Sequence, residues 1–232
     1  MIRDLKGTVD DKIPVKTILV SVFDKSGLEE FIPGLLRVEP HLLILSTGGT
    51  YTKIKAILGD NFEYNLMEVA SYTEFPEMEG GLVKTLHPKI HAGILGERNN
   101  PEHQKYLTDT LHNARYIDMV VVNLYPFEEV VKSSPSFEKA RGNIDIGGPT
   151  MIRAAAKNFP SCAAVCDPAK YGRIVEALQE NEGSTTFEQR LRLARRVFAL
   201  TAAYDKAIAE YFNQQVETSL PEVKGSYQFR EG

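Results

Sequence analysis

The sequence contains only two cysteines among its 232 residues. Cys162 and Cys166 lie four residues apart in a short apolar run that is typical of a buried strand. Residues four apart on a strand face the same side, but their Cα atoms are about 13 Å apart, which is too far for a disulfide bond. The sequence therefore predicts two reduced thiols with a structural role, as is usual in the cytosol.

The sequence also lacks an excess of positive charge and any long apolar run. Its formal net charge is -4, so no general positive field attracts nucleic acid, and an anion site has to be built from local groups. No apolar run approaches the roughly 18 residues that span a bilayer, and no secretory leader opens the sequence. We therefore expect a soluble, cytoplasmic protein that binds neither nucleic acid nor membranes but accepts small phosphorylated ligands.

Apolar segments rich in β-branched residues alternate with segments of helical periodicity, which is typical of an α/β fold with a mostly parallel sheet. The run Met119-Val120-Val121-Val122 predicts a strand that is covered on both faces. The predicted strands are residues 16–22, 42–45, 62–67, 90–95, 117–124 and 163–166. The predicted helices are residues 27–36, 52–58, 101–111, 150–158, 168–179 and 185–212. Residues 1–15 are expected to be flexible, residues 16–213 to form the domain, and residues 214–232 to form a polar tail.

Two predicted strand-to-helix turns carry residues that suit a phosphate group. The candidate ligands in them are Ser21, Lys25, Ser46, Thr47, Gly48, Gly49 and Thr50. Turns of this kind expose backbone amides at the positive end of a helix, and lysine and hydroxyl groups add further donors. Taken singly, each turn is better explained as an ordinary turn that uses Gly, Ser and Thr for backbone geometry and capping. Because neighbouring parallel strands bring both turns to one sheet edge, the pair favours a phosphate pocket.

Lys84 and Thr85 follow two glycines in the segment of residues 80–95. A lone lysine is usually a solvated side chain. The glycine pair and the apolar residues next to Lys84 favour a constrained loop instead, in which a lysine holds an anion or polarises a carbonyl group.

Two histidines follow in the same segment. His87 and His91 lie four residues apart, but Pro88 and the predicted strand of residues 90–95 argue against a zinc-binding helix. We therefore expect histidines that are hydrogen-bonded to the loop backbone and no metal site.

Further candidates follow the strongest predicted strand. Tyr125 lies just after its end, either as a catalytic hydroxyl or as a packed aromatic ring. Asp145 lies between two isoleucines and close to two glycines, which suits a general base or, as an alternative, a helix N-cap. Arg153 and Lys157 lie one helical turn apart, so they face either one pocket or the solvent.

The motifs at residues 80–95, 143–150 and 153–158 together resemble the inosine monophosphate (IMP) cyclohydrolase family, a domain of the bifunctional purine-biosynthesis protein. The resemblance covers residues 16–213, and it implies a three-layer α/β fold similar to methylglyoxal synthase. This fold would comprise a core of residues 16–158, with a mostly parallel sheet, and a helical completion of residues 159–213. By resemblance, the chemistry is carried by Lys84, Tyr125, Asp145 and Lys157. By resemblance, the substrate is held by Ser21, Lys25, Ser46, Thr47, Gly48, Gly49, Thr50, Thr85, Asn123, Ile146 and Gly147.

The implied enzyme is a hydrolase of the cyclic amidine class. It closes the purine ring of 5-formamidoimidazole-4-carboxamide ribotide with loss of water and needs no cofactor or metal. Asp145 would take the carboxamide proton and Lys84 would polarise the formyl oxygen, while Tyr125 and Lys157 would assist the departing hydroxide. The resemblance also implies a homodimer. Because the transformylase domain is absent from this sequence, a separate transformylase is expected to supply the substrate.

The sequence departs from the family at two positions. Phe23 stands where the family often has serine, and Leu82 stands where it often has arginine, so two polar donors near the phosphate are missing or replaced. Two alternatives remain open. A regulatory module of the same fold would bind a nucleotide or small phosphorylated effector, but it would not need all four chemical residues. Methylglyoxal synthase resembles the chain only in fold and in the phosphate turns.

Overall fold

Five parallel strands form the central sheet of the structure, a computed structural model that describes residues 8–76, 78–79, 83–133 and 135–230. The strand order is β4-β3-β2-β5-β6, and every neighbouring pair is parallel. The strands are β2 (Thr17–Val22), β3 (Leu43–Ser46), β4 (Leu66–Glu68), β5 (Met119–Asn123) and β6 (Ala163–Val165). Consecutive residues of β2 and β5 are buried, so both faces of the sheet are covered, as predicted.

The chain folds as two units. The first comprises Met1–Leu124 and Gly147–Phe198, and it contains the sheet. The second comprises Tyr125–Ile146 and Ala199–Gly232. Helix α10 (Phe187–Thr218) contributes its first part to one unit and its remainder to the other. The sequence predicted one domain of residues 16–213, with a core of residues 16–158 and a helical completion of residues 159–213, and this division stays a prediction.

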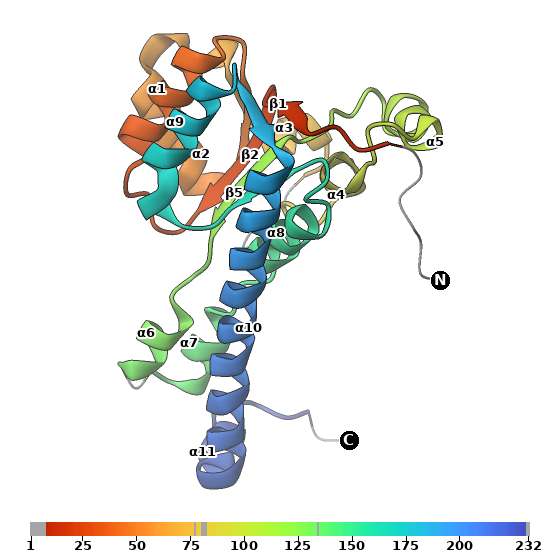
Figure 1. Cartoon of the computed structure of the whole chain (residues 1–232). Helices are drawn as coiled ribbons and strands as arrows, with labels where there is room; N and C mark the ends of the chain where they lie inside the picture. The colour runs from red at the N-terminus through yellow and green to blue at the C-terminus, as the bar shows by residue number, and fades with distance from the viewer. Residues whose placement is uncertain (1–7, 77, 80–82, 134, 231–232) are drawn as a thin grey trace. The chain divides into compact units, whose positions relative to one another are not determined.

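Three helices cover one face of the sheet, as Figure 1 shows. They are α1 (Leu28–Val38), α2 (Gly48–Leu58) and α9 (Tyr171–Glu180). The ring of Phe31 stacks on that of Tyr171 with 4.2 Å between the ring centroids. A Cβ atom at Gly34 would lie 3.0 Å from a methyl carbon of Val175, so the glycine allows α1 and α9 to pack closely. Helix α1 continues through Pro33 and is slightly longer than predicted.

The opposite face of the sheet is covered by α3 (Val69–Thr73), α4 (Pro88–Leu95), α8 (Gly147–Lys157) and the first part of α10. Ile90 and Ile94 of α4 pack there with Ile152 of α8. Helices on both faces of a parallel sheet make a three-layer α/β architecture, which confirms the predicted fold class.

Helix α4 corrects the prediction of a strand at residues 90–95. The helix begins at Pro88, and the Nδ1 atom of His87 caps it by accepting the backbone N–H of Lys89 at 3.1 Å. Proline fits this place because the first helical residue needs no intrahelical N–H donor. A short apolar run with β-branched residues is compatible with either a buried strand or a buried helix, so periodicity alone was misleading.

Other boundaries also differ from the sequence prediction. The segment 62–67 contains the end of a 3₁₀ helix (Gly59–Tyr64) followed by β4, and the segment 101–111 divides into α5 (Pro101–Lys105) and a π-helical turn (Tyr106–Thr110). Strand β1 (Lys12–Pro14), in the segment expected to be flexible, pairs antiparallel with β7 (Ser184–Thr186). A 3₁₀ turn (Pro168–Lys170) precedes α9, and α11 (Leu220–Gly225) lies in the segment expected to be an unpatterned tail.

Arg190 holds the two residues that precede β1, Asp10 and Asp11. Its side chain is fully buried and donates hydrogen bonds of 2.6 to 3.1 Å to five backbone carbonyls, those of Asp10, Asp11, Phe159, Pro160 and Thr185. Burial lowers the pKa of the guanidinium to about 10, so it remains charged at neutral pH. One side chain of α10 therefore joins three segments that are far apart in the sequence.

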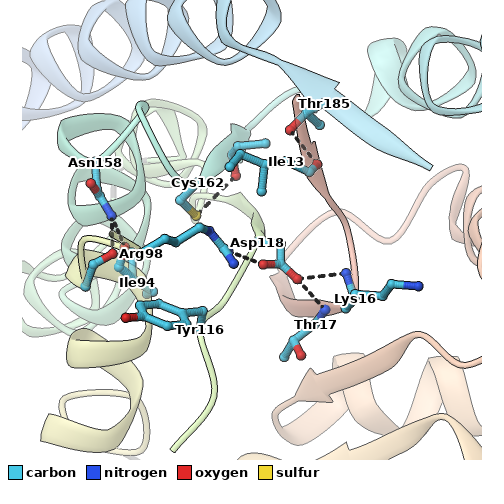
Figure 2. A network of polar contacts seen from close by, with 12 residues as sticks. Ile13, Lys16, Thr17, Ile94, Arg98, Tyr116, Asp118, Asn158, Cys162 and Thr185 are labelled. Carbon is cyan, nitrogen blue, oxygen red and sulfur yellow. Dashed lines mark hydrogen bonds and ion pairs between the residues drawn. The ribbon is translucent and has the colours of Figure 1, made fainter. Parts of the chain in front are cut away.

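A second buried polar network lies at the amino end of β5, as Figure 2 shows. The Asp118 carboxylate pairs with Arg98 and accepts the backbone N–H groups of Lys16 and Thr17, each at 2.7 Å. Nearby, Nδ2 of Asn158 donates to the carbonyl of Ile94 at 2.7 Å. These contacts stabilise the amino edge of the sheet, which is the edge opposite to the two strand-to-helix turns.

Both cysteines flank β6 and are free thiols, which confirms that they form no disulfide. Cys162 is fully buried, and burial raises its pKa well above the usual range. Burial also raises the pKa of Cys166 to about 11. Both groups are therefore protonated and unreactive at neutral pH.

The second unit is built around aromatic rings. It contains α6 (Phe127–Lys132), α7 (Phe137–Gly142), the remainder of α10, and α11. The ring of Phe137 stacks on Tyr211, and Phe127 meets Tyr211 edge-on at 5.7 Å between centroids.

Over the described residues, no helix is both long enough and apolar enough to cross a bilayer.

Candidate active site

Two turns meet at the carboxyl edge of the sheet. Strands β2 and β3 are parallel neighbours, with Val20 opposite Ser46, so the turns that follow them lie side by side, as predicted. The hydroxyl groups of Ser21 and Thr47 are 3.1 Å apart and form a hydrogen bond between the two turns. This edge is where ligands bind in open parallel sheets.

Two lysines flank the first turn of α2 at this edge. A Cβ atom at Gly48 would lie 3.5 Å from Nζ of Lys84, and a Cβ atom at Gly49 would lie 3.6 Å from Cε and 3.9 Å from Nζ of Lys25. The side chain of Thr47 does not cap the helix, and its first turn contains no acidic residue. Two cations at the positive end of a helix dipole repel each other, and the dipole repels both of them. The arrangement is favourable when an anion lies among them, as a phosphate dianion would.

The backbone of this turn also suits an anion. Gly48 has a φ of 48°, a left-handed conformation that glycine adopts without strain. The first amides of an α-helix have no partner within the helix, so those of Gly48 and Gly49 point outward from its amino end. Lys25 is held over the turn by a hydrogen bond of 3.1 Å from Nζ to the carbonyl of Phe23.

Two of the predicted phosphate ligands use their hydroxyl groups within the fold. The hydroxyl of Ser46 donates to the carbonyl of Val20 at 2.8 Å. That of Thr50 accepts the N–H of Val22 at 3.1 Å and donates to the carbonyl of the same residue at 3.0 Å. These contacts fix the two turns relative to one another, so Ser46 and Thr50 shape the cradle. Their direct contact with a ligand stays a prediction.

Asn123, at the end of β5, holds the other turn. Its Oδ1 accepts the N–H groups of Phe23 and Asp24 at 2.7 and 2.9 Å, and its Nδ2 donates to the carbonyl of Asp24 at 2.8 Å. Asn123 therefore holds the turn that carries Lys25, and its direct contact with the substrate stays a prediction. The side chain of Phe23, where the family often has serine, is about half exposed at the same turn.

Thr85 joins the site to the start of α8. Its side chain is buried, and a Cβ atom at Gly147 would lie 2.9 Å from its Oγ1. The amino end of a second helix therefore lies against the loop that carries Lys84. The glycines before this loop and Leu82 lie outside the described residues.

Lys157 is not brought to this end of α8. It is exposed in the last turn of the helix, ten residues after Gly147, which corresponds to about 15 Å along the axis. Arg153, one turn earlier, lies over the ring of Phe198, with Cζ 5.5 Å from the ring centroid. The catalytic role of Lys157 therefore stays a prediction to which the fold of α8 adds no support.

Tyr125 and Asp145 belong to the second unit, whereas Lys84 and Lys157 belong to the first. Tyr125 is exposed and Asp145 is half-buried just before α8. The backbone N–H of Asp145 donates to the hydroxyl of Tyr204 at 2.8 Å. For Tyr204 the sequence predicted only a place in the helix of residues 185–212, because a tyrosine in a helix gives no signal of the partner that its hydroxyl finds.

Both histidines are hydrogen-bonded to the backbone, His91 to the loop as predicted and His87 to the first turn of α4. His87 caps α4, and the ring of His91 is hydrogen-bonded to the backbone of Thr85. Burial lowers the pKa of both histidines. Within the ranges that the structure describes, no group of three or more His, Cys, Asp or Glu side chains is placed to hold a metal ion.

The MGS-like domain model matches residues 27–150, which is more than half of the chain. The chain belongs to the MGS-like domain family. A second family model, described as the AICARFT/IMPCHase bienzyme, matches residues 155–231. Together the two matches confirm the resemblance that the sequence motifs predicted.

Curated relatives of this MGS-like protein include the bifunctional purine biosynthesis protein PurH of Rhodospirillum rubrum, which is 47% identical over 209 residues, or 90% of this chain. PurH of Rhizobium rhizogenes is 44% identical over 211 residues, or 91% of this chain. The chain spans 38% of the length of each of these relatives. The crystal structure of ForH is similar in fold, with a TM-score of 0.69 and 29% identity over 85% of this chain and 98% of that one.

Proposed function

We propose that this protein is an IMP cyclohydrolase, which closes the ring of 5-formamidoimidazole-4-carboxamide ribotide to give IMP. The observation that carries the proposal is the pair of ammonium groups, from Lys25 and Lys84, around the Gly48-Gly49 turn at the amino end of α2. This cradle suits the 5-phosphate of a ribotide. The similarity to PurH proteins over about 90% of the chain supports the choice of that substrate.

In the proposed reaction the carboxamide nitrogen attacks the formyl carbon of the same molecule. Asp145 accepts the proton from the nitrogen as the new C–N bond forms. Lys84 and the backbone amides of Ile146 and Gly147 stabilise the charge that develops on the formyl oxygen. The oxyanion takes up a proton to give a carbinolamine, which then loses its hydroxyl group as water, with Tyr125 and Lys157 proposed as proton donors. The former formamide nitrogen releases its proton to solvent as the C=N bond of the purine forms. Because the ring closure is intramolecular, the protein mainly holds the two groups in the reactive rotamer.

The direct test is to incubate purified protein with the formylated ribotide and to follow purine formation by ultraviolet absorbance and chromatography. We expect conversion to IMP without metal, cofactor or nucleoside triphosphate. A protein that is folded but inert overturns the proposal. Binding of a nucleotide without turnover then indicates a regulatory module, and release of phosphate from a triose phosphate indicates a methylglyoxal synthase.

The same proposal includes a separate source of substrate. A cyclohydrolase consumes a formylated ribotide, so a formyl-transfer reaction has to supply it. We propose that the residues of this chain do not perform this step. Unformylated ribotide with formyl-tetrahydrofolate should then give no IMP with the 232-residue chain alone. IMP formation in that mixture would show that the chain carries both activities.

We also propose, from the family resemblance, that the protein is a cytoplasmic homodimer. Sedimentation of the purified chain over a range of concentrations measures the mass directly. A monomer at all concentrations that retains full turnover would contradict the dimer.

A further inference from the structure

Tyr204 contacts both ends of the segment Tyr125–Ile146. At the far end, its hydroxyl oxygen accepts the backbone N–H of Asp145 at 2.8 Å. At the near end, its ring meets Phe127 edge-on, with 6.3 Å between centroids and an interplanar angle of 70°. One side chain of α10 therefore contacts the segment near both of its ends, at Phe127 and at Asp145.

The surroundings of Tyr204 make this contact rigid. Only 8% of the residue is exposed, and Phe127 is buried and also packs on Tyr211. Burial raises the pKa of Tyr204, and the charges of Asp145 and Asp205 and nearby Tyr125 raise it further. The group is therefore a neutral hydroxyl at neutral pH, which can accept the N–H of Asp145 and still donate its own proton.

We propose that Tyr204 is a positioning residue for Asp145, holding its backbone so that the carboxylate is aligned with the carboxamide of the substrate. The inference rests on the proposed function. A backbone N–H in a partly buried segment needs an acceptor, and without the hydroxyl the segment before α8 has to shift to find one. A displacement of about 1 Å in a reacting group costs roughly a hundredfold in rate.

The test compares wild-type protein with Tyr204→Phe, which removes one oxygen and keeps the ring. We expect kcat to fall by about 10- to 100-fold while KM changes by less than about threefold, because the phosphate cradle lies on other elements. The matched control is Tyr211→Phe, a change on the same helix and in the same aromatic cluster. It should leave kcat within about twofold of wild type.

A double-mutant cycle separates positioning from a merely structural role. If Tyr204 acts through the carboxylate, adding Tyr204→Phe to Asp145→Asn lowers the residual kcat by less than about twofold. A full additional loss in that background would overturn the inference, and so would wild-type kcat in Tyr204→Phe. All assays are run well below the lowest melting temperature of the set, so that each variant is folded.

The two proposals fail in different ways. Wild-type protein that does not cyclise the formylated ribotide refutes the proposed function. Active wild-type protein with an equally active Tyr204→Phe variant refutes only the role of Tyr204.

Discussion

Gly147 and Thr85 approach so closely that a Cβ atom at Gly147 would lie 2.9 Å from Oγ1 of Thr85. The contact joins the first residue of α8 to the loop that carries Lys84. Glycine is required here by the approach of another side chain, since Gly147 is not among the residues with positive φ.

Gly147→Ala should therefore displace Thr85 and weaken nucleotide binding. The added methyl group overpacks a buried contact, so we expect a loss of about 1–3 kcal/mol in stability together with weaker binding of IMP. Calorimetric titration and chemical denaturation measure the two effects. Gly172→Ala is the control, because a Cβ atom there meets no atom within 4 Å. Equal effects of the two substitutions would contradict the assigned contact.

Lys25→Ala and Lys84→Ala should each weaken the binding of IMP by about tenfold or more, because each removes a charge-assisted donor from the cradle. Each unliganded variant should melt at the same or a higher temperature than wild type, since one cation fewer lies at the positive end of the α2 dipole. Thermal melts with and without IMP test both statements. Inosine, which lacks the phosphate, should give little stabilisation of wild type, and stabilisation equal to that by IMP would refute a phosphate cradle.

Arg190→Ala should lower the stability of the folded protein by at least about 3 kcal/mol, because backbone carbonyls that it now satisfies lose their donor. Urea denaturation measures the change. Arg192, two residues along the same helix, forms an exposed ion pair with Glu188. Arg192→Ala should leave the denaturation midpoint nearly unchanged. A small effect of Arg190→Ala would show that β1 is held without it.

Stability should decrease as the pH falls below about 6.5. Burial lowers the pKa of His87 and of His91 in the folded protein, so the unfolded chain binds more protons in this range. The stabilisation is present in full above the unfolded pKa and is lost as the pH falls toward the folded one. Protonation of His87 also removes the acceptor that caps α4. Melting temperatures between about pH 8 and pH 5 report the decline.

His87→Asn tests the source of this pH dependence. Asparagine is a good N-cap but does not titrate, so α4 should form normally and the decline between neutral and acidic pH should become shallower. An unchanged slope would assign the pH dependence to other groups.

The parallel sheet and the two adjacent strand-to-helix turns at its carboxyl edge were predictable from the sequence because their signals are local. A run of buried β-branched residues such as Val120-Val121-Val122 specifies a covered strand wherever it occurs. A glycine-containing turn between a strand and a helix specifies exposed amides. The helix at residues 88–95 was not predictable in this way, because its short apolar run fits either element and only packing of Ile90 and Ile94 on the sheet decides.

The sequence by itself determined the chemistry that is available, namely Lys25, Lys84 and the Gly48-Gly49 turn. Tertiary structure alone decided which groups meet. It turned Asn123 toward the turn that carries Lys25, and it left Lys157 at the far end of α8 from Gly147. It also placed the hydroxyl of Tyr204 on the backbone of Asp145, 59 residues away. The physical reason is that a hydrogen bond between distant residues depends on how whole helices pack, and local sequence carries no record of that packing.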